Sequence, residues 1–361
     1  ATLTPFAEDD TTAETSHLKF DAVFPEDCEQ HEFFDSSVRP VVEGALEGRS
    51  SVVVVYGQTG SGKRYTLFGS EDALSRFTCD ARADCDGAAG LGVIPRAFDV
   101  LAKGIDARPC TTFVVRVSFL YILRSDVHDL LAQQVGARPR LRVRQQPAPG
   151  PDGRRVFVEG LSTRVARHVC DLREAFSDGL AALGQVMGGT SARHISTIFT
   201  IDVEAYAAQP TGLLLLRRGS SRFVKLGGSE RTTASELAWR GIHLANQVAM
   251  KICVRTFERV VMALAANEAG RRHIPCRDSP LTYILRDSLG GEADVLLIAT
   301  CAAVDIHFNE TRSSVRFASR ARSAKTAVVA HESVCAEDEF RLLVDESWAA
   351  GAGMRKQCPC H

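Results

Sequence analysis

The chain has 361 residues, 45% of them hydrophobic and 24% charged, and its formal net charge is −1. This composition is typical of a globular protein with a sizeable core, and the small net charge excludes attraction to nucleic acid or membranes through a global field. No apolar run reaches the roughly 18 residues that a membrane span needs, and the acidic segment Ala1–His17 lacks the pattern of a signal peptide. We therefore expect an intracellular protein with neither nucleic acid nor membrane as a partner.

The cysteines are odd in number, 11 in all, and irregularly spaced, which argues against a disulfide framework. Cys358, Cys360 and His361 offer three metal ligands at the end of the chain, but no fourth ligand is evident. We therefore expect no metal site.

The hydrophobic pattern predicts strands that alternate with helices. The expected strands are Val52–Tyr56, Thr112–Leu120, Arg155–Val158, Thr197–Glu204, Leu213–Arg217, Phe223–Leu226 and Val295–Cys301. The expected helices are Ser37–Glu47, Ile94–Lys103, Asp171–Leu183, Leu244–Ala266 and Ser279–Ser288. This alternation favours an α/β fold with helices on both faces of a sheet. The turn Gln209–Gly212 predicts an antiparallel hairpin, so the sheet should be mixed.

We expect one domain over residues 18–326, because the one clear Pro- and Gly-rich loop, Gln145–Arg155, is too short to separate two domains. Residues 1–17 form a flexible N-terminal segment in this prediction. Residues 327–361 form a C-terminal extension, with a short helix over Glu337–Ala349.

The strand Val52–Tyr56 leads into a glycine loop of the form G-x-x-x-x-G-K. In such P-loops the glycines let backbone N–H groups converge on phosphates, and the lysine reaches the outer phosphate oxygens. The pattern therefore predicts a site for the phosphates of a nucleotide. Its expected contact residues are Gly57, Gln58, Thr59, Gly60, Ser61, Gly62, Lys63, Arg64 and Tyr65.

The stretch VVVVYGQTGSGKRYTLFG resembles the P-loop of the kinesin motor domain. Other kinesin-like blocks follow the family's order, among them LKFDAVF before the loop and GVIPRAF, VSFLYILRSDVHDLL and VFVEGLS after it. SARHISTIFTIDV resembles switch I, VKLGGSER resembles switch II, and HIPCRDSPLTYILRDSLGGEADVLLIAT and NETRSSVRFASRARSAK are similar to the last blocks of the family. The resemblance covers residues 18–326. It implies a P-loop NTPase fold with a central mixed, mainly eight-stranded sheet, and ATP-driven work on microtubules.

The sequence departs from the kinesin pattern where the family binds Mg²⁺. The Ser or Thr that follows the P-loop lysine and binds the metal is Arg64 here. The Asp that opens switch II is Lys225, and a switch I serine aligns with Ala192. We hypothesise that Arg64 and Lys225 act as built-in counterions, so that nucleotide binds without Mg²⁺ and hydrolysis is lost or very slow. A competing interpretation is an empty pocket in which Arg64 pairs with a local carboxylate such as Asp72.

Other switch residues match the family. Gly228 stands at the switch II glycine that senses the γ-phosphate, and Arg193 and Glu230 match the pair that latches switch I to switch II. No catalytic residue is expected beyond these latch candidates. Alternatively, Glu230 is an ordinary solvated acid.

The resemblance also implies a microtubule-binding face. Lys251, Arg255 and Arg259 recur every four residues and so share one face of a helix, whereas a family lysine is replaced by Pro280. The remaining candidates are Arg271, Arg272 and Arg277, and a run of arginines at period two, Arg138, Arg140, Arg142 and Arg144. Together they predict a patch for an acidic partner, here tubulin. The alternative is that these residues only solvate a surface.

The preferred interpretation is a kinesin-like, microtubule-associated pseudo-motor with a structural or anchoring role. Its expected location is the cytoplasm, on the microtubules of the cytoskeleton, with axonemal microtubules as an option. Two alternatives stay open: an active ATP-dependent microtubule motor, and a non-motor regulatory subunit that binds a heteromeric protein partner.

Overall fold

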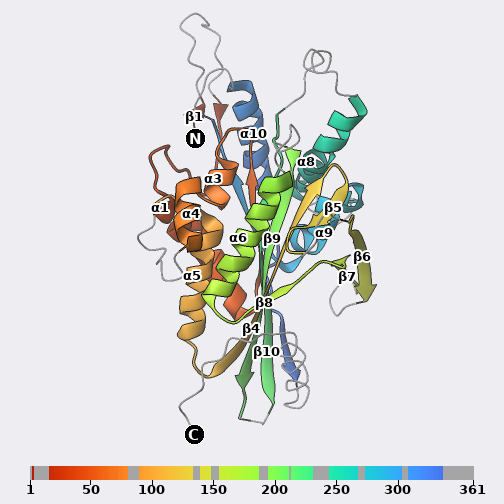
Figure 1. The fold of residues 1–361 in the computed structure, drawn as a ribbon. Helices are drawn as coiled ribbons and strands as arrows, with labels where there is room; N and C mark the ends of the chain where they lie inside the picture. The colour runs from red at the N-terminus through yellow and green to blue at the C-terminus, as the bar shows by residue number, and fades with distance from the viewer. Residues whose placement is uncertain are drawn as a thin grey trace, which may run out of the picture.

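The computed structural model describes residues 2–3, 16–79, 89–132, 139–147, 154–186, 194–210, 213–230, 244–266, 273–302 and 308–335. In this part of the chain a large twisted sheet stands in the centre with helices on both sides (Figure 1). Its strand order is β11-β3-β10-β9-β4-β5, with β12 beside β10 and β8 beside β4. The strands are β3 (Ser50–Tyr56), β4 (Thr111–Leu123), β5 (Asp126–Asp129), β8 (Arg164–Ala166), β9 (Ser196–Ala208), β10 (Leu214–Lys225), β11 (Asp294–Ala299) and β12 (Glu332–Cys335).

The sheet is mixed, as the sequence predicts. β11, β3 and β10 run parallel, whereas β10, β9 and β4 run antiparallel. The predicted hairpin is the β9–β10 pair, in which Leu214 lies opposite Ala208. The two strands expected around residues 213–226 are one continuous strand, β10. Gly219 interrupts the apolar pattern there because Ala45 packs so closely that a Cβ on Gly219 would lie 2.0 Å from its carbonyl oxygen.

Both faces of the sheet are covered, which explains the continuous apolar run in β3. Val53 and Val55 pack into one hydrophobic cluster, whereas Val52, Val54 and Tyr56 pack into another. On the first face lie α4 (Glu71–Cys79), α5 (Val93–Asp106) and α6 (Val169–Val186). On the second face lie α8 (Leu244–Ala265), α9 (Pro280–Ile284) and α10 (Phe308–Ala321). None of the helices in the described residues is long and apolar enough to cross a membrane.

Two predicted helices are shorter or more broken than expected. The segment expected as Ser37–Glu47 consists of the end of a π-helical turn (Phe34–Val38), α2 (Arg39–Glu43) and a 3-10 turn (Gly44–Glu47), and α1 (Gln30–Phe33) precedes it. Pro40 lacks the N–H that a continuous helix needs and stands in the first turn of α2 instead. α9 likewise begins at Pro280, and the preceding Ser279 caps it by accepting a hydrogen bond from the Thr282 N–H at 3.2 Å.

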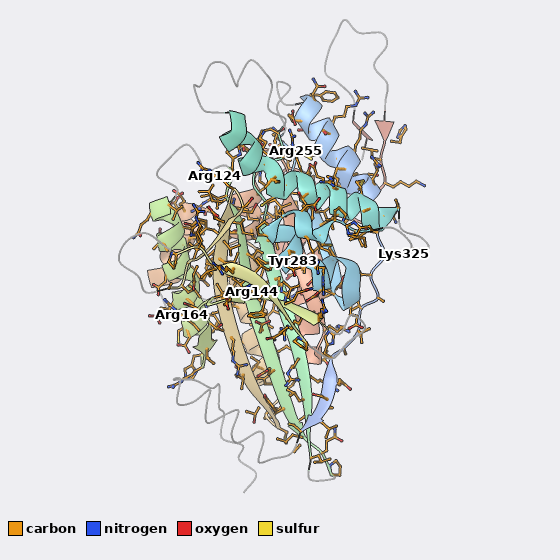
Figure 2. All side chains as sticks on the ribbon, turned by 90° about the vertical axis from the view of Figure 1, so that its right-hand side faces the viewer. Arg124, Arg144, Arg164, Arg255, Tyr283 and Lys325 are labelled. Carbon is orange, nitrogen blue, oxygen red and sulfur yellow. The ribbon has the colours of Figure 1, made fainter. Side chains whose placement is uncertain are left out.

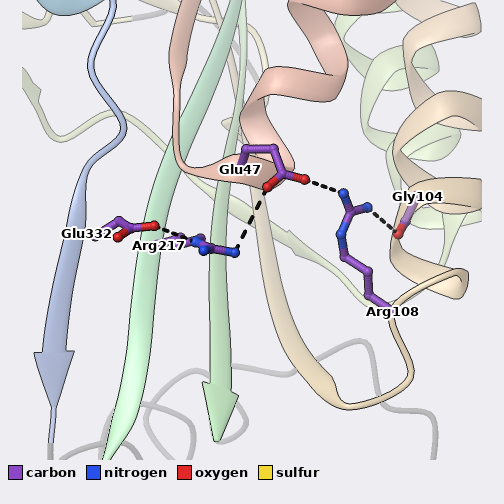
Figure 3. A network of polar contacts seen from close by, with 5 residues as sticks. All are labelled: Glu47, Gly104, Arg108, Arg217 and Glu332. Atoms are coloured by element: carbon purple, nitrogen blue, oxygen red, sulfur yellow. Dashed lines mark hydrogen bonds and ion pairs between the residues drawn. The ribbon is translucent and has the colours of Figure 1, made fainter. Parts of the chain in front are cut away.

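Two small strand pairs lie outside the main sheet. β6 (Arg142–Pro147) and β7 (Arg154–Glu159) form a hairpin over α9, and β1 (Thr2–Leu3) pairs with β2 (Ser16–His17). The predicted boundary at residue 326 is followed by β12, which pairs with the start of β10. Figure 3 shows how charges hold this edge: Arg217 lies 2.7 Å from Glu332 and 4.0 Å from Glu47, which in turn pairs with Arg108.

Candidate nucleotide site and basic surface

The phosphate loop leaves the sheet at the carboxyl end of β3, beside the ends of β10 and β11 (Figure 1). Gly57, Gly60 and Gly62 all have positive φ, at 153°, 84° and 96°. A Cβ on Gly57 would lie 2.4 Å from the carbonyl oxygen of Thr300, so only glycine fits against the end of β11. A Cβ on Gly60 or Gly62 would meet nothing within 4 Å. The backbone between these two glycines is therefore open to a ligand.

Lys63 begins the short helix α3 (Lys63–Leu67) and folds back under the loop. Its Nζ donates hydrogen bonds to the carbonyl oxygens of Gly57 at 2.7 Å and Gln58 at 2.5 Å. Burial lowers the pKa of Lys63 to about 8, and the negative charge of Glu230 partly opposes this shift. The side-chain amide of Gln58 is buried and has no hydrogen-bond partner among the described residues. The loop thus has donors that a polyanion can use.

Lys225 ends β10, directly beside Val55 on β3. Its side chain is buried, and its Nζ donates a hydrogen bond to the carbonyl oxygen of Ile195 at 2.8 Å. Burial, together with the positive charges of Lys63 and Arg64, lowers the pKa of Lys225 to about 7. The lysine therefore fixes the start of the switch I strand and carries only part of a positive charge at neutral pH.

Arg64 lies at the outer side of α3 and is half-exposed. Its guanidinium stands 5.7 Å from the centroid of the Phe68 ring, and its nearest carboxylate is Glu71 at 3.9 Å. The competing interpretation named Asp72, but the neighbouring Glu71 is the residue within reach. Arg64 is half-exposed and Glu71 is largely exposed, so this contact contributes little and leaves Arg64 available to a ligand.

Glu230 in switch II contacts the phosphate loop. Its carboxylate accepts hydrogen bonds from the backbone N–H of Thr59 at 3.0 Å and from the Thr59 hydroxyl at 2.8 Å. Burial favours the neutral acid, but these hydrogen bonds and the charge of Lys251 outweigh it and lower the pKa of Glu230. Gly228 allows the contact, since a Cβ there would lie 2.1 Å from the carboxylate. Glu230 is therefore not a freely solvated acid; its predicted partner Arg193 lies outside the described residues.

The loop suits the phosphates of ATP or ADP better than it suits Mg²⁺. Glycines with positive φ, the buried Lys63 and the unpartnered amide of Gln58 match a phosphate ligand. Magnesium prefers oxygen ligands, usually one or two carboxylates plus phosphate and water. Here the two positions for metal ligands carry the cations Arg64 and Lys225, and the Glu230 carboxylate is bonded to Thr59. Among the described residues, the side chains at these positions therefore suit phosphate better than they suit the metal.

A group of exposed arginines, the basic surface, lies on the side of the molecule that carries α8, α9 and the β6–β7 hairpin, and Figure 2 labels two of its members, Arg144 and Arg255. The candidates Arg140, Arg142, Arg144, Arg255, Arg259 and Arg277 are all exposed there. Lys251 is a correction: it is on α8 but buried, and its Nζ donates to the carbonyl oxygen of Glu230. Lys251 precedes Arg255 by one helical turn, as the spacing of four residues indicates, but the backbone of Glu230 in switch II packs over Lys251 and buries it. Arg138, Arg271 and Arg272 lie outside the described residues.

Carboxylates neutralise half of the exposed candidates. Arg140 pairs with Asp126 at 3.2 Å, Arg144 with Glu159 at 3.1 Å and Arg259 with Asp278 at 3.2 Å. Arg277 instead donates to the Gln145 amide oxygen at 3.3 Å and lies 5.8 Å from the centroid of the Tyr283 ring. Within the described ranges, no carboxylate partner is found for Arg142 and Arg255.

Sequence reasoning missed a polar junction between the loop strand and α8. The hydroxyl of Tyr56, at the end of β3, donates to Glu258 Oε1 at 2.5 Å. Burial, and then the charge of Glu258, raise the pKa of Tyr56. Next to them, the Ser229 and Ser314 hydroxyls lie 3.1 Å apart and join switch II to α10. No sequence pattern signals this contact, because its members come from four separate elements.

A parallel strand, a glycine loop and a lysine at the start of a helix together define a P-loop nucleotide-binding fold. The family model of the kinesin motor domain matches residues 4–324. The chain therefore belongs to the kinesin motor domain family, a family of microtubule motors that bind ATP and ADP.

Individual relatives agree with this assignment. Kinesin-like protein KIF3C of Mus musculus and of Rattus norvegicus is 30% identical over 336 residues, and that of Pongo abelii is 30% identical over 334 residues. These alignments cover 85% of this chain but 39% of each relative, so the chain spans about two fifths of their length. A solved structure described as a fast kinesin has a TM-score of 0.75 and 29% identity, covering 91% of this chain and 86% of the other.

Proposed function

We propose that this chain is a kinesin-like pseudo-motor: a microtubule-associated structural or anchoring module that holds nucleotide without Mg²⁺ and does not hydrolyse it. The observation that carries the proposal is Lys225, whose buried Nζ stands where the family has a carboxylate and donates to the carbonyl oxygen of Ile195. We propose residues 18–326 as the motor-like unit and the cytoplasmic cytoskeleton as its location.

The loss of hydrolysis follows from charge and coordination. Phosphoryl transfer depends on a metal that bridges the β- and γ-phosphate oxygens and on a positioned water. A cation beside Lys63, Arg64 and Lys225 would be repelled in a partly buried pocket. Arginine and lysine neutralise phosphate charge, but they do not supply the coordination geometry of a metal. Binding and hydrolysis are therefore separable in this site.

The microtubule contact is proposed from the exposed arginines on the side of α8. Arg255 and Arg142 have no carboxylate partner in the described part of the chain and so stay available to an acidic surface. Arg259 and Arg277 lie close by but share their charge with Asp278 and Gln145. We therefore expect binding that weakens as salt rises, since exposed charges are screened.

One sample tests both halves of the proposal. ATP hydrolysis is measured with and without microtubules, and co-sedimentation with microtubules is measured without nucleotide. We expect pelleting without microtubule-stimulated hydrolysis. Stimulated hydrolysis would support the active motor instead, and the absence of pelleting would favour a regulatory subunit in a heteromeric complex. ADP binding with EDTA and with Mg²⁺ tests the metal-free site, since a strong requirement for Mg²⁺ would contradict it.

A further inference from the structure

Arg124 is the one non-glycine residue with positive φ in the described ranges, at 61°. It sits in the two-residue turn between β4 and β5, where the antiparallel pairing of Leu123 with Asp126 ends. Glycine has no Cβ and adopts positive φ readily, and asparagine and aspartate offset the cost with local hydrogen bonds, whereas the Cβ of an arginine crowds the backbone there without such compensation. The turn therefore keeps an arginine at a position that other residues would occupy at lower cost.

No hydrogen bond or ion pair with the described residues accounts for the position of the Arg124 side chain. It is exposed, and the described residues provide no carboxylate partner for it. Asp126, the acid closest in sequence, pairs with Arg140 at 3.2 Å. The two-residue turn itself calls for a positive φ at this position, but not for an arginine, and strained residues cluster at functional sites.

The surroundings of Arg124 place it on the basic surface. Its carbonyl oxygen accepts a hydrogen bond from the Cys253 thiol at 3.3 Å, which fixes the turn against α8 two residues before Arg255. The same hairpin reaches β6 through the bridge between Val127 and Leu141, so Arg142 follows directly. Figure 2 shows Arg124 and Arg255 near each other in the upper part of this face. Arg124, Arg142 and Arg255 each lack a carboxylate partner among the described residues, and they come from neighbouring elements.

We propose that Arg124 is a microtubule-contacting residue that has its strained position because of the contact: the turn gives up stability to present a positive charge beside Arg255. The inference rests on the proposed binding of microtubules by this face. An acidic protein surface fits the three unneutralised guanidinium groups, which offer planar, bidentate donors for carboxylates. Its distinguishing consequence is that one substitution should change stability and binding in opposite directions.

The decisive variant is Arg124→Asn. Asparagine tolerates positive φ, so the midpoint of thermal unfolding should rise by about 1–2 °C. Loss of the charge should weaken co-sedimentation with microtubules about threefold to tenfold at low salt, and less at high salt. Arg124→Lys keeps the charge and the strained backbone but loses the planar guanidinium, so it should unfold like the wild type and bind microtubules more weakly than the wild type but more tightly than Arg124→Asn.

Two further variants serve as matched controls. Arg255→Gln should weaken pelleting without any gain in stability, because α8 imposes no strain on that residue. Arg76→Gln, on α4 at the opposite face of the sheet, should leave pelleting unchanged (Figure 1). Wild-type-like pelleting of Arg124→Asn, or equal losses for Arg124→Asn and Arg124→Lys, would overturn the inference alone. Failure of the wild type to pellet would overturn it together with the proposed function.

Discussion

The carboxylate of Glu230 accepts two hydrogen bonds from Thr59, one from the backbone N–H at 3.0 Å and one from the hydroxyl at 2.8 Å. Switch II therefore places a negative charge on the loop whose donors would bind a phosphate. The Glu230 carboxylate therefore acts as an internal anion: a bound nucleotide either displaces it from the loop or binds against its repulsion. This arrangement joins the two nucleotide-sensing segments of the fold without any ligand.

Replacing Glu230 with glutamine should strengthen polyanion binding. Glutamine keeps the size of the side chain but removes the charge that repels phosphate, which we expect to be worth about 1 kcal/mol, or a fivefold gain in ADP affinity. Titration calorimetry in EDTA measures the ADP affinity of the variant and of the wild type. The matched control is Glu159→Gln, because Glu159 pairs with Arg144 on the β6–β7 hairpin. Weaker ADP binding by Glu230→Gln would show that the carboxylate organises the loop for the ligand.

Lys225 should make the free energy of unfolding depend on pH. Its pKa falls from an ordinary 10.5 to about 7, so between these values the unfolded chain binds more protons than the folded protein, and stability rises with pH. From pH 7 to 8 we expect a gain of about 1 kcal/mol, with a smaller share from Lys63, whose pKa is about 8. This window ends before the cysteines titrate, whose raised pKa values act in the opposite direction.

The variant Lys225→Met tests whether Lys225 causes the rise in the free energy of unfolding between pH 7 and pH 8. Methionine removes a buried charge and should stabilise the protein by about 2–4 kcal/mol at pH 7, while most of the pH dependence disappears. Urea unfolding at pH 7 and pH 8 provides both numbers. An unchanged slope, or a variant less stable than the wild type at pH 7, would mean that the hydrogen bond to Ile195 outweighs the cost of burial.

The sequence predicted the central strands of the sheet because their signals are local, whereas the short strands β5, β8 and β12 were not predicted. Val52–Val55 form a continuous apolar run since β3 is buried on both faces, and the β9–β10 hairpin is marked by its own turn. The seven-residue loop motif likewise placed Gly57 and Lys63, because the loop conformation depends mainly on where its glycines stand.

Local sequence patterns could not predict the contacts between segments that are far apart in the chain. Thr59 and Glu230 are 171 positions apart, and the family pattern supplied Arg193 as the partner instead. The period of four residues put Lys251 in line with Arg255, but its burial depends on how the switch II backbone crosses α8. Whether Arg64 faces Glu71 or Asp72 depends on where α4 begins, which a one-residue shift would change.

Tyr56→Phe should destabilise the junction between the loop strand and α8. The change removes the hydroxyl that donates to Glu258 at 2.5 Å, and a hydrogen bond to a charged acceptor contributes about 1.5–3 kcal/mol. Urea unfolding of Tyr56→Phe, Glu258→Gln and the double variant gives the coupling between the two residues. Additive effects would show that the two side chains do not interact in solution.

Restoring the metal ligands should restore the response to magnesium. In the wild type we expect Mg²⁺ to leave ADP affinity unchanged or lower it, because Arg64 and Lys225 already supply positive charge at the phosphates. The double variant Arg64→Thr, Lys225→Asp replaces these cations with a hydroxyl and a carboxylate, which suit Mg²⁺. We expect its ADP affinity to rise about tenfold or more on adding Mg²⁺ and to fall below wild type in EDTA.

Arg64→Thr alone is the control, since Lys225 would still repel the ion. Far-UV circular dichroism confirms folding, because Lys225→Asp also removes the hydrogen bond to Ile195. Tighter ADP binding by the wild type in Mg²⁺ than in EDTA would contradict the exchange of metal for side-chain cations.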